Sequence, residues 1–246
     1  MTTWARQIYE HNPLAIAKGE VNGYSSIHKF GAVPSLSINT TGTIWDVNDT
    51  IYPWSAFDTA GVLNIPVVNA GDDGDRVTVF GLDENFNEIE EDFTLSSTVT
   101  VTGTKTFSRV YRAYYYDSTS NSGDITVRRG TTTVLRIKAG KAQTLMCVYT
   151  VPAGYTAYLT QGIASIKYGG DASIEMFVRY FGQTSFRIGH AGEVAGTGMP
   201  YHYRFTVPIA IPEKSDIDVR ASVRSNNSKV TAAFDLILVE NTYRDV

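Results

Sequence analysis

From Ile44 onward, short apolar or alternating segments follow one another at intervals of about ten residues, and clusters of Gly, Asn, Asp and Pro separate them. Alternation with a period of two residues indicates β-strands, whereas an α/β fold would need helical crossovers between the strands. Only TTWARQIYEH, near the N-terminus, has helical spacing, with Trp4 and Ile8 on one side. The sequence therefore predicts an all-β protein with about a dozen strands.

Composition narrows the possible functions of the chain. At 246 residues it is long enough to bury one or two cores without disulfides, and its formal net charge of -4 gives no clustered basic excess for nucleic-acid binding. No apolar run of about 18 residues exists, and no apolar segment follows the first Arg. We therefore expect no nucleic acid or membrane as partner, no secretory signal, and assembly in the cytoplasm of the cell that translates the chain.

A change in composition suggests where the chain divides. Residues 128–140, RRGTTTVLRIKAG, contain no large aromatic residue, and the strands that follow are longer and more aromatic. We predict two antiparallel β-sandwiches, residues 44–130 and 131–246, of which the second is jelly-roll-like. Alternation predicts these inward-facing residues: Val77, Val79, Phe93, Leu95, Val148, Ile174, Met176, Val178, Leu236 and Leu238.

Residues 1–43 are expected to form an irregular N-terminal arm, because chain-breaking residues alternate with isolated apolar ones. Such a segment cannot bury enough surface by itself to offset its ordering entropy. Two alternatives remain open: the arm packs on a neighbouring subunit as an assembly device, or it packs back over its own sandwich. The first predicts that deletion of residues 1–23 leaves a folded monomer that no longer assembles.

The stretch RVTVFGLDENFNEIEEDFTL, residues 76–95, has a carboxylate-rich centre. Asp83, Asn85 and Asn87 match the start of a calcium loop, but Glu88 stands where such a loop needs Gly and Thr94 where it needs Glu. A looser calcium site could include the acids of NAGDDGDRV, residues 69–77, although these residue types also suit tight turns. We predict a hairpin with its turn at residues 83–87, and calcium near Asp72 to Glu88 is the alternative.

Motifs for catalysis are weak in this sequence. Glu88, Glu90 and Asp92 would share one face of a strand, which indicates a solvated face more than the converging acid pair of a glycosidase. The sequence has no nucleophile elbow, phosphate loop or zinc-binding HExxH motif. Cys147 lies in an apolar run and is expected to be a small core residue. We therefore predict no catalytic residues, no metal and no cofactor.

The segment GHAGEVAGTGMPYHYRF, residues 189–205, is expected to form a long loop rich in Gly, His and Tyr. Aromatic residues on exposed loops can stack on sugars, so a host surface glycan is one candidate ligand. The alternative is an ordinary jelly-roll connection or a loop held by a neighbouring subunit. The receptor-loop candidates are His190, Glu193, Tyr201 and His202.

Several segments together carry a resemblance. IHKFG at 27–31, TIWD at 43–46, YPW at 52–54, GLDENFNEIEEDFTL and FSRVYRAYY occur in order, followed by YTVPAGYTAYLTQ, PIAIPEKSDIDVRASV and FDLILVE. This succession covers most of residues 24–240 and resembles virion structural proteins of tailed phages of cyanobacteria and other marine bacteria. Members commonly have IWDGGG where this chain has IWDVND.

The resemblance implies a non-enzymatic virion component, as head decoration, neck or tail accessory, whose partners are other virion proteins and copies of itself. The alternatives are a carbohydrate- or receptor-binding module of the phage tail and a glycan-degrading enzyme. An all-β chain rich in Tyr and Arg suits a protein that binds neighbouring subunits, although cross-strand packing inside one sheet would explain the same residues. The interface candidates are Trp4, Ile8, Ile27, His28, Phe30, Trp45, Arg109, Tyr111, Arg112 and Tyr114.

Overall fold

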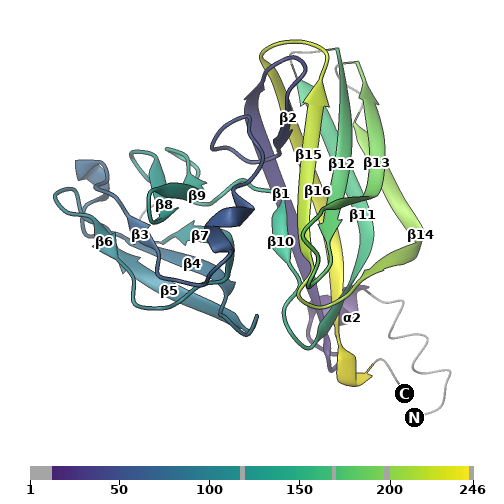
Figure 1. Cartoon of the computed structure of the whole chain (residues 1–246), viewed down its shortest axis with the longest axis horizontal. Helices are drawn as coiled ribbons and strands as arrows, with labels where there is room; N and C mark the ends of the chain where they lie inside the picture. Colours follow the sequence, from purple (N-terminus) through teal and green to yellow (C-terminus); the bar gives the residue numbers. More distant parts are fainter. Residues whose placement is uncertain (1–12, 117–119, 168–169, 197–199, 244–246) are drawn as a thin grey trace.

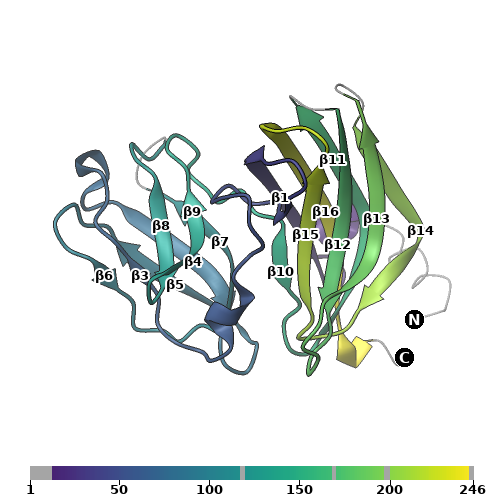
Figure 2. The same cartoon turned by 45° about the horizontal axis from the view of Figure 1, so that its top comes forward.

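The computed structural model describes residues 13–116, 120–167, 170–196 and 200–243, and it confirms the all-β class (Figure 1). Trp4 and Ile8 lie outside these ranges. Two antiparallel β-sandwiches stand side by side, and the chain passes between them close to β2 and β10 (Figures 1 and 2). Within the described ranges, no helix has the length and apolar character needed to cross a membrane.

The larger sandwich is a jelly roll made of two facing sheets. The strand order of its first sheet is β1 (Tyr24–Leu36), β16 (Ser228–Glu240), β11 (Tyr155–Lys167) and β14 (Tyr201–Ile211). The order of its second sheet is β10 (Val148–Thr150), β15 (Asp216–Val223), β12 (Asp171–Arg179) and β13 (Arg187–Ala195), and β2 (Thr41–Thr43) also pairs with β15. In this arrangement the first strand pairs with the last, as in a jelly roll built from two Greek keys.

The smaller sandwich comes between β2 and β10 in the sequence, so it is an insertion into the jelly roll. One of its sheets has the order β6 (Val101–Thr102), β3 (Asn64–Ile65), β8 (Ile125–Arg129) and β9 (Thr132–Ile137). The other has the order β5 (Glu88–Thr94), β4 (Arg76–Leu82) and β7 (Arg109–Tyr115). The insertion also contains the short 3-10 helices η1 (Trp54–Phe57) and η2 (Ala70–Asp72), whereas a third, η3 (Asn241–Tyr243), follows β16 of the jelly roll.

The structure corrects the expected irregular arm. Residues 24–36 form β1, which pairs with β16 from Tyr24↔Val239 to Leu36↔Ser228, with a bulge around Pro34. Ala15 and Ile16 of the short helix α2 (Pro13–Ala17) are also buried. The strand was missed because its inward positions include Lys29 and Gly31, which hide the alternation. From residue 13 onward the arm therefore belongs to its own jelly roll, so deletion of residues 1–23 would remove part of the fold.

The boundary between the sandwiches also differs from the expectation at residue 130. Strand β9 pairs with β8 from Ile125↔Ile137 to Arg129↔Thr132, so residues 131–137 complete a hairpin of the smaller sandwich. Val134 and Ile137 lie in the core of that sandwich. The low aromatic content of residues 128–140 was therefore a property of one hairpin and not of a linker between domains.

The predicted inward-facing positions are all buried, with exposed fractions between 0% and 7%. In the jelly roll, Ile174, Met176, Leu236 and Leu238 lie in one core cluster, and Val77, Val79 and Phe93 lie in the core of the inserted sandwich. Cys147 is fully buried, and its thiol donates to the carbonyl oxygen of Ala232. Burial raises the pKa of this thiol to about 12, so Cys147 is an inert core residue.

The predicted hairpin at residues 83–87 is confirmed. Strands β4 and β5 pair from Arg76↔Thr94 to Leu82↔Glu88, and Asp83 accepts hydrogen bonds of 2.8 Å from the backbone N–H groups of Asn85 and Asn87. Phe86 has a φ of 66°, the left-handed conformation that closes the turn. The carboxylate-rich centre is therefore an Asx-type turn at the end of a hairpin.

Gly31 gives a first prediction about stability. A Cβ atom on Gly31 would lie 2.4 Å from the carbonyl oxygen of Ile44 and 2.7 Å from the backbone nitrogen of Cys147, at the place where both crossing segments pass β1. Because these neighbours are backbone atoms, Gly31→Ala should lower the free energy of unfolding by about 1 to 3 kcal/mol, measured by urea denaturation. Gly162→Ala on β11 is the matched control, since its Cβ would meet nothing within 4 Å. Equal effects of the two substitutions would contradict this account.

Candidate functional site

The inserted sandwich is joined to the jelly roll through a buried carboxylate. Asp216 on β15 is 2% exposed and accepts from Arg109 of β7 at 2.7 and 3.1 Å. It also accepts from Arg179 of β12 at 3.0 and 2.6 Å and from the Thr150 hydroxyl at 2.7 Å. Since Arg109 comes from one sandwich and Arg179 from the other, Asp216 ties the two together.

A second buried carboxylate completes this contact. Asp218 is fully buried and accepts from the Thr43 hydroxyl at 2.8 Å, from Trp54 Nε1 at 3.0 Å and from Arg220 Nε at 2.9 Å. Trp54 begins η1 of the inserted segment, so this carboxylate also connects the two parts of the chain. We call the contact formed around Asp216 and Asp218 the domain joint.

Aromatic rings and cations alternate across the domain joint. The Trp54 ring lies 5.8 Å from the Arg109 guanidinium and 5.4 Å from that of Arg179, measured to the ring centroid. Phe86, at the tip of the β4–β5 hairpin, lies 5.4 Å from Arg109 and stacks edge to face on Phe181 of the jelly roll at 5.6 Å. Its carbonyl oxygen also accepts from the backbone N–H of Ala153. The hairpin tip thus serves to dock the insertion on the jelly roll.

Several interface candidates from the sequence meet at the domain joint or beside it. Arg109 binds Asp216, Tyr111 stacks edge to face on Tyr149 at 5.1 Å, and Arg112 donates to the carbonyl oxygen of His28. These three residues therefore make contacts between the two sandwiches of one chain.

The remaining described candidates divide between buried and surface positions. Trp45 is 2% exposed in the core of the inserted sandwich, and Tyr114 packs edge to face on Phe80 at 5.6 Å. Ile27 packs against the jelly-roll core, while Phe30 is half-buried beside the exposed His28, with 5.5 Å between ring centroids.

The predicted long loop at residues 189–205 is largely strand. Residues 187–195 form β13 and residues 201–211 form β14, which are the edge strands of the two facing sheets. His190 Nε2 lies 2.8 Å from the Tyr201 hydroxyl, and the His190 ring is 4.9 Å from both Tyr203 and Phe205. The aromatic residues that suggested a receptor loop therefore form a cluster between two sheet edges.

The two other receptor-loop candidates lie on the surface. Glu193 is exposed and accepts from the Ser173 hydroxyl at 2.8 Å, while the exposed His202 lies 3.4 Å from Gln161 Oε1.

The side of the jelly roll formed by the edge strands β13 and β14 exposes apolar side chains. Ile188 on β13 is 54% exposed, Tyr203 on β14 is 44% exposed and Val207 on β14 is 80% exposed. Residues 205–208 of β14 lie opposite the single residue Thr160 of β11, so the edge strand bulges at this point. We call Ile188, Tyr203 and Val207 the edge patch.

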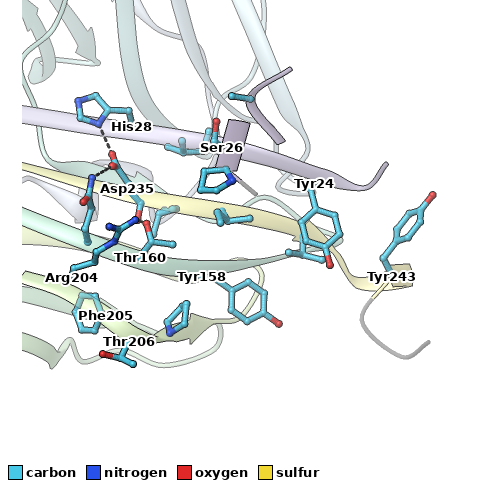
Figure 3. Close-up of a pocket in the computed structure, with 18 residues that line it drawn as sticks. Tyr24, Ser26, His28, Tyr158, Thr160, Arg204, Phe205, Thr206, Asp235 and Tyr243 are labelled. Carbon is cyan, nitrogen blue, oxygen red and sulfur yellow. Dashed lines mark hydrogen bonds and ion pairs between the residues drawn. The ribbon is translucent and has the colours of Figure 1, made fainter. Parts of the chain in front are cut away.

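A groove lies on the first jelly-roll sheet (Figure 3). Its lining residues Tyr158 and Val239 are next to the core residues Leu159 and Leu238 in their strands, so it lies on the face that points away from the second sheet. Its volume is about 760 Å³, and residues of β1, β16, β11 and β14 line it together with Pro13, Ala17 and Tyr243. Asp235 lies 2.5 Å from His28 Nδ1 and also accepts from the Gln161 side-chain amide. Arg204 and the rings of Tyr158 and Phe205 line the same groove (Figure 3). We call it the outer groove.

The acids that suggested calcium have structural roles. Asp72 is fully buried and accepts from the backbone N–H groups of Ser122 and Gly123 at 2.6 and 2.9 Å, while Asp73 accepts from Ser97. Among the described residues, no three His, Cys, Asp or Glu side chains are grouped closely enough to hold a metal ion.

The acids of β5 face in the predicted directions. Glu88, Glu90 and Asp92 are exposed, whereas Glu91 is 8% exposed and caps the backbone of residues 104–105.

Sequence reasoning missed the residues that matter most at these sites, which are Asp216, Asp218, Asp235 and Arg204. The DIDVR stretch carried one usable signal, since two acids on alternate positions of an otherwise apolar strand indicate charges directed inward. Asp235, in FDLILVE, and Arg204, in YHYRF, carried no such signal. Their importance depends on partners far away in the sequence.

The fold and its sites define a class: an all-β protein whose jelly roll carries an inserted sandwich held on it by buried ion pairs.

No family model and no curated protein matches the chain. Among solved structures, the chain is weakly similar to that of infectious bursal disease virus, Gt strain, with a TM-score of 0.27 and 10% identity over 90% of this chain and 74% of that one. The crystal structure of the VP2 subviral particle of the same virus gives 0.24 and 10% over 92% and 74%. Similarities of this size carry no argument about function.

Proposed function

We propose that this chain is a non-enzymatic structural protein of a tailed-phage virion, acting by protein–protein binding within the particle as head decoration, neck or tail accessory. The edge patch is the observation that carries the proposal. Edge strands present unpaired backbone groups, and exposed apolar side chains beside them mark surfaces that bind other proteins. The sequence resemblance over residues 24–240 supports the same reading.

The domain joint supports it further. Cation–aromatic contacts and buried ion pairs hold the inserted sandwich on the jelly roll, so the two domains can act as one rigid building block. A rigid block loses little conformational entropy when it joins copies of itself or other virion proteins. We expect a homo-oligomer in the particle, and localisation in the virion.

The test is the incorporation of variants into particles. Val207→Glu should reduce the copy number per purified virion about tenfold or more, because a charge buried without a partner costs several kcal/mol. Val67→Glu is the matched control, since Val67 is 55% exposed on the inserted sandwich, away from the edge patch. Quantitative mass spectrometry of virions gives the copy numbers, and thermal melts verify that both variants fold. Absence of the unmodified chain from virions would overturn the proposal, and equal incorporation of both variants would exclude the edge patch as the contact.

A further inference from the structure

We infer that the outer groove is a binding site for a short, carboxylate-bearing oligosaccharide. This inference concerns the outer face of the first jelly-roll sheet and does not depend on the edge patch. The groove is large enough for such a ligand, since its 760 Å³ falls within the volumes typical of small-molecule sites. Along β1 it extends from His28 to Tyr24, which is about 13 Å at 3.3 Å per residue, so it can hold more than one sugar unit.

Charge is the first argument for the class of ligand. The Asp235 carboxylate is engaged on both oxygens, by His28 Nδ1 on one and by the Gln161 amide on the other. The side chain of Arg204, which pairs in register with Gln161, makes no hydrogen bond or ion pair within the described part of the chain. Its guanidinium is therefore a cation available to a ligand, and it presents the planar donors that bind a carboxylate with two hydrogen bonds.

The other groups in the groove suit a sugar. Tyr158 offers an aromatic ring on which the apolar face of a pyranose can stack, and Ser26, Thr160 and Thr206 offer hydroxyl groups. Sugar hydroxyls both donate and accept, so they match these hydroxyl side chains, while apolar lining residues such as Ile237 and Val239 suit the apolar faces of the sugar rings.

An extended peptide is a poorer match to this floor. The central strands β16 and β11 have neighbours on both sides, so their backbone groups are already paired within the sheet. A peptide that binds by strand addition needs a free strand edge, whereas an occupant of a sheet face is held through side chains alone. Backbone groups of a peptide placed there would find few partners, and sugar rings have no such requirement.

Isothermal titration calorimetry with the full chain tests the inference. The probes are a tetramer of galacturonic acid, a neutral tetramer of galactose and a tetraglutamate peptide. We expect the uronate tetramer to bind most tightly. Arg204→Gln should weaken its affinity about ten- to a hundredfold, the loss expected for a hydrogen bond to a charged group. Arg204→Lys should restore part of that affinity, because it returns the charge without the planar fork.

The matched control is Arg187→Gln, which removes an exposed arginine from β13 on the other sheet and should leave binding unchanged. Both arginines are exposed, so the variants should fold, and thermal melts verify this. The inference is overturned if no saccharide binds at millimolar concentration, if Arg204→Gln and Arg187→Gln behave alike, or if tetraglutamate binds as tightly as the uronate. None of these outcomes bears on incorporation into virions, so failure here is distinguishable from failure of the proposed function.

Discussion

Raising the pH from 7 to 9 should increase the free energy of unfolding by about 2 to 3 kcal/mol, and Lys29→Met should abolish this increase. The prediction rests on a buried lysine between the two sandwiches. Lys29 on β1 is 2% exposed, and its ammonium group donates to the carbonyl oxygen of Tyr111 on β7. Burial, followed by the nearby positive charge of Arg112, lowers the pKa of Lys29 from 10.5 to about 7.

The sign follows from where the proton is bound. In the unfolded chain Lys29 keeps its proton up to about pH 10.5, whereas in the folded protein it loses the proton near pH 7. Between these values the unfolded state binds more protons, so stability rises as the pH increases from 7 toward 10.5; below pH 7 both states carry the proton, and Lys29 causes no further change.

Two other buried groups also titrate, so the effect of Lys29 on stability is best measured between pH 7 and 9. Asp46 has its pKa raised to about 7 by burial, which makes stability fall as the pH rises toward 7. The Cys147 thiol titrates near pH 9.0 when unfolded and near 12 when folded, so above pH 9 it opposes Lys29.

Urea denaturation at pH 7, 8 and 9 measures the effect. Lys229→Met is the matched control, because Lys229 is an exposed lysine on β16 of the same sheet, and its removal should leave the pH dependence intact. A Lys29→Met protein that keeps the slope of the unmodified chain would show that another group is responsible.

Asp216→Ala should lower the free energy of unfolding by about 3 to 5 kcal/mol, the cost of removing one partner from a buried ion pair. The side chains of Arg109 and Arg179 are only 14% and 17% exposed, so the substitution leaves two guanidinium groups poorly hydrated and unpaired from this carboxylate. It also removes the acceptor of the Thr150 hydroxyl.

Because Asp216 ties the sandwiches together, its loss should also make them unfold less cooperatively, and calorimetry should show two transitions in place of one. Asp58→Ala is the matched control, since Asp58 is exposed and its removal should change stability by less than about 0.5 kcal/mol. A loss below about 1 kcal/mol for Asp216→Ala would contradict the role given to the domain joint.

Two features of the fold could be predicted because they depend on local pattern. Alternation identified the all-β class and the buried positions, from Val77 to Leu238, because a strand with one covered face must place apolar side chains at every second residue. Turn chemistry identified the hairpin at residues 83–87, because Asp and Asn close such turns with their own side chains.

The arrangement of these elements could not be predicted from local pattern. Strand β1 belongs to the jelly roll because it pairs with β16, some 200 residues later. Its inward residues Lys29 and Gly31 are explained only by the segments that pack against β1 in the folded protein, such as the backbone of Ile44 and Cys147 beside Gly31. The insertion of one sandwich into the other also depends on pairings between strands far apart in the sequence, so the order of the strands along the chain did not predict it.

The sequence by itself determined the class of fold, the buried positions from Val77 to Leu238 and the turn at residues 83–87, because these depend on local alternation and turn chemistry. Only the tertiary structure decided that Arg109 meets Asp216 and that Lys29 is buried beside Tyr111. It also decided that the Asp235 side chain, but not the Arg204 side chain, has a polar partner among the described residues. The physical reason is that the energy of a charged side chain depends on its burial and its partners, and these come from strands that pair across long sequence separations.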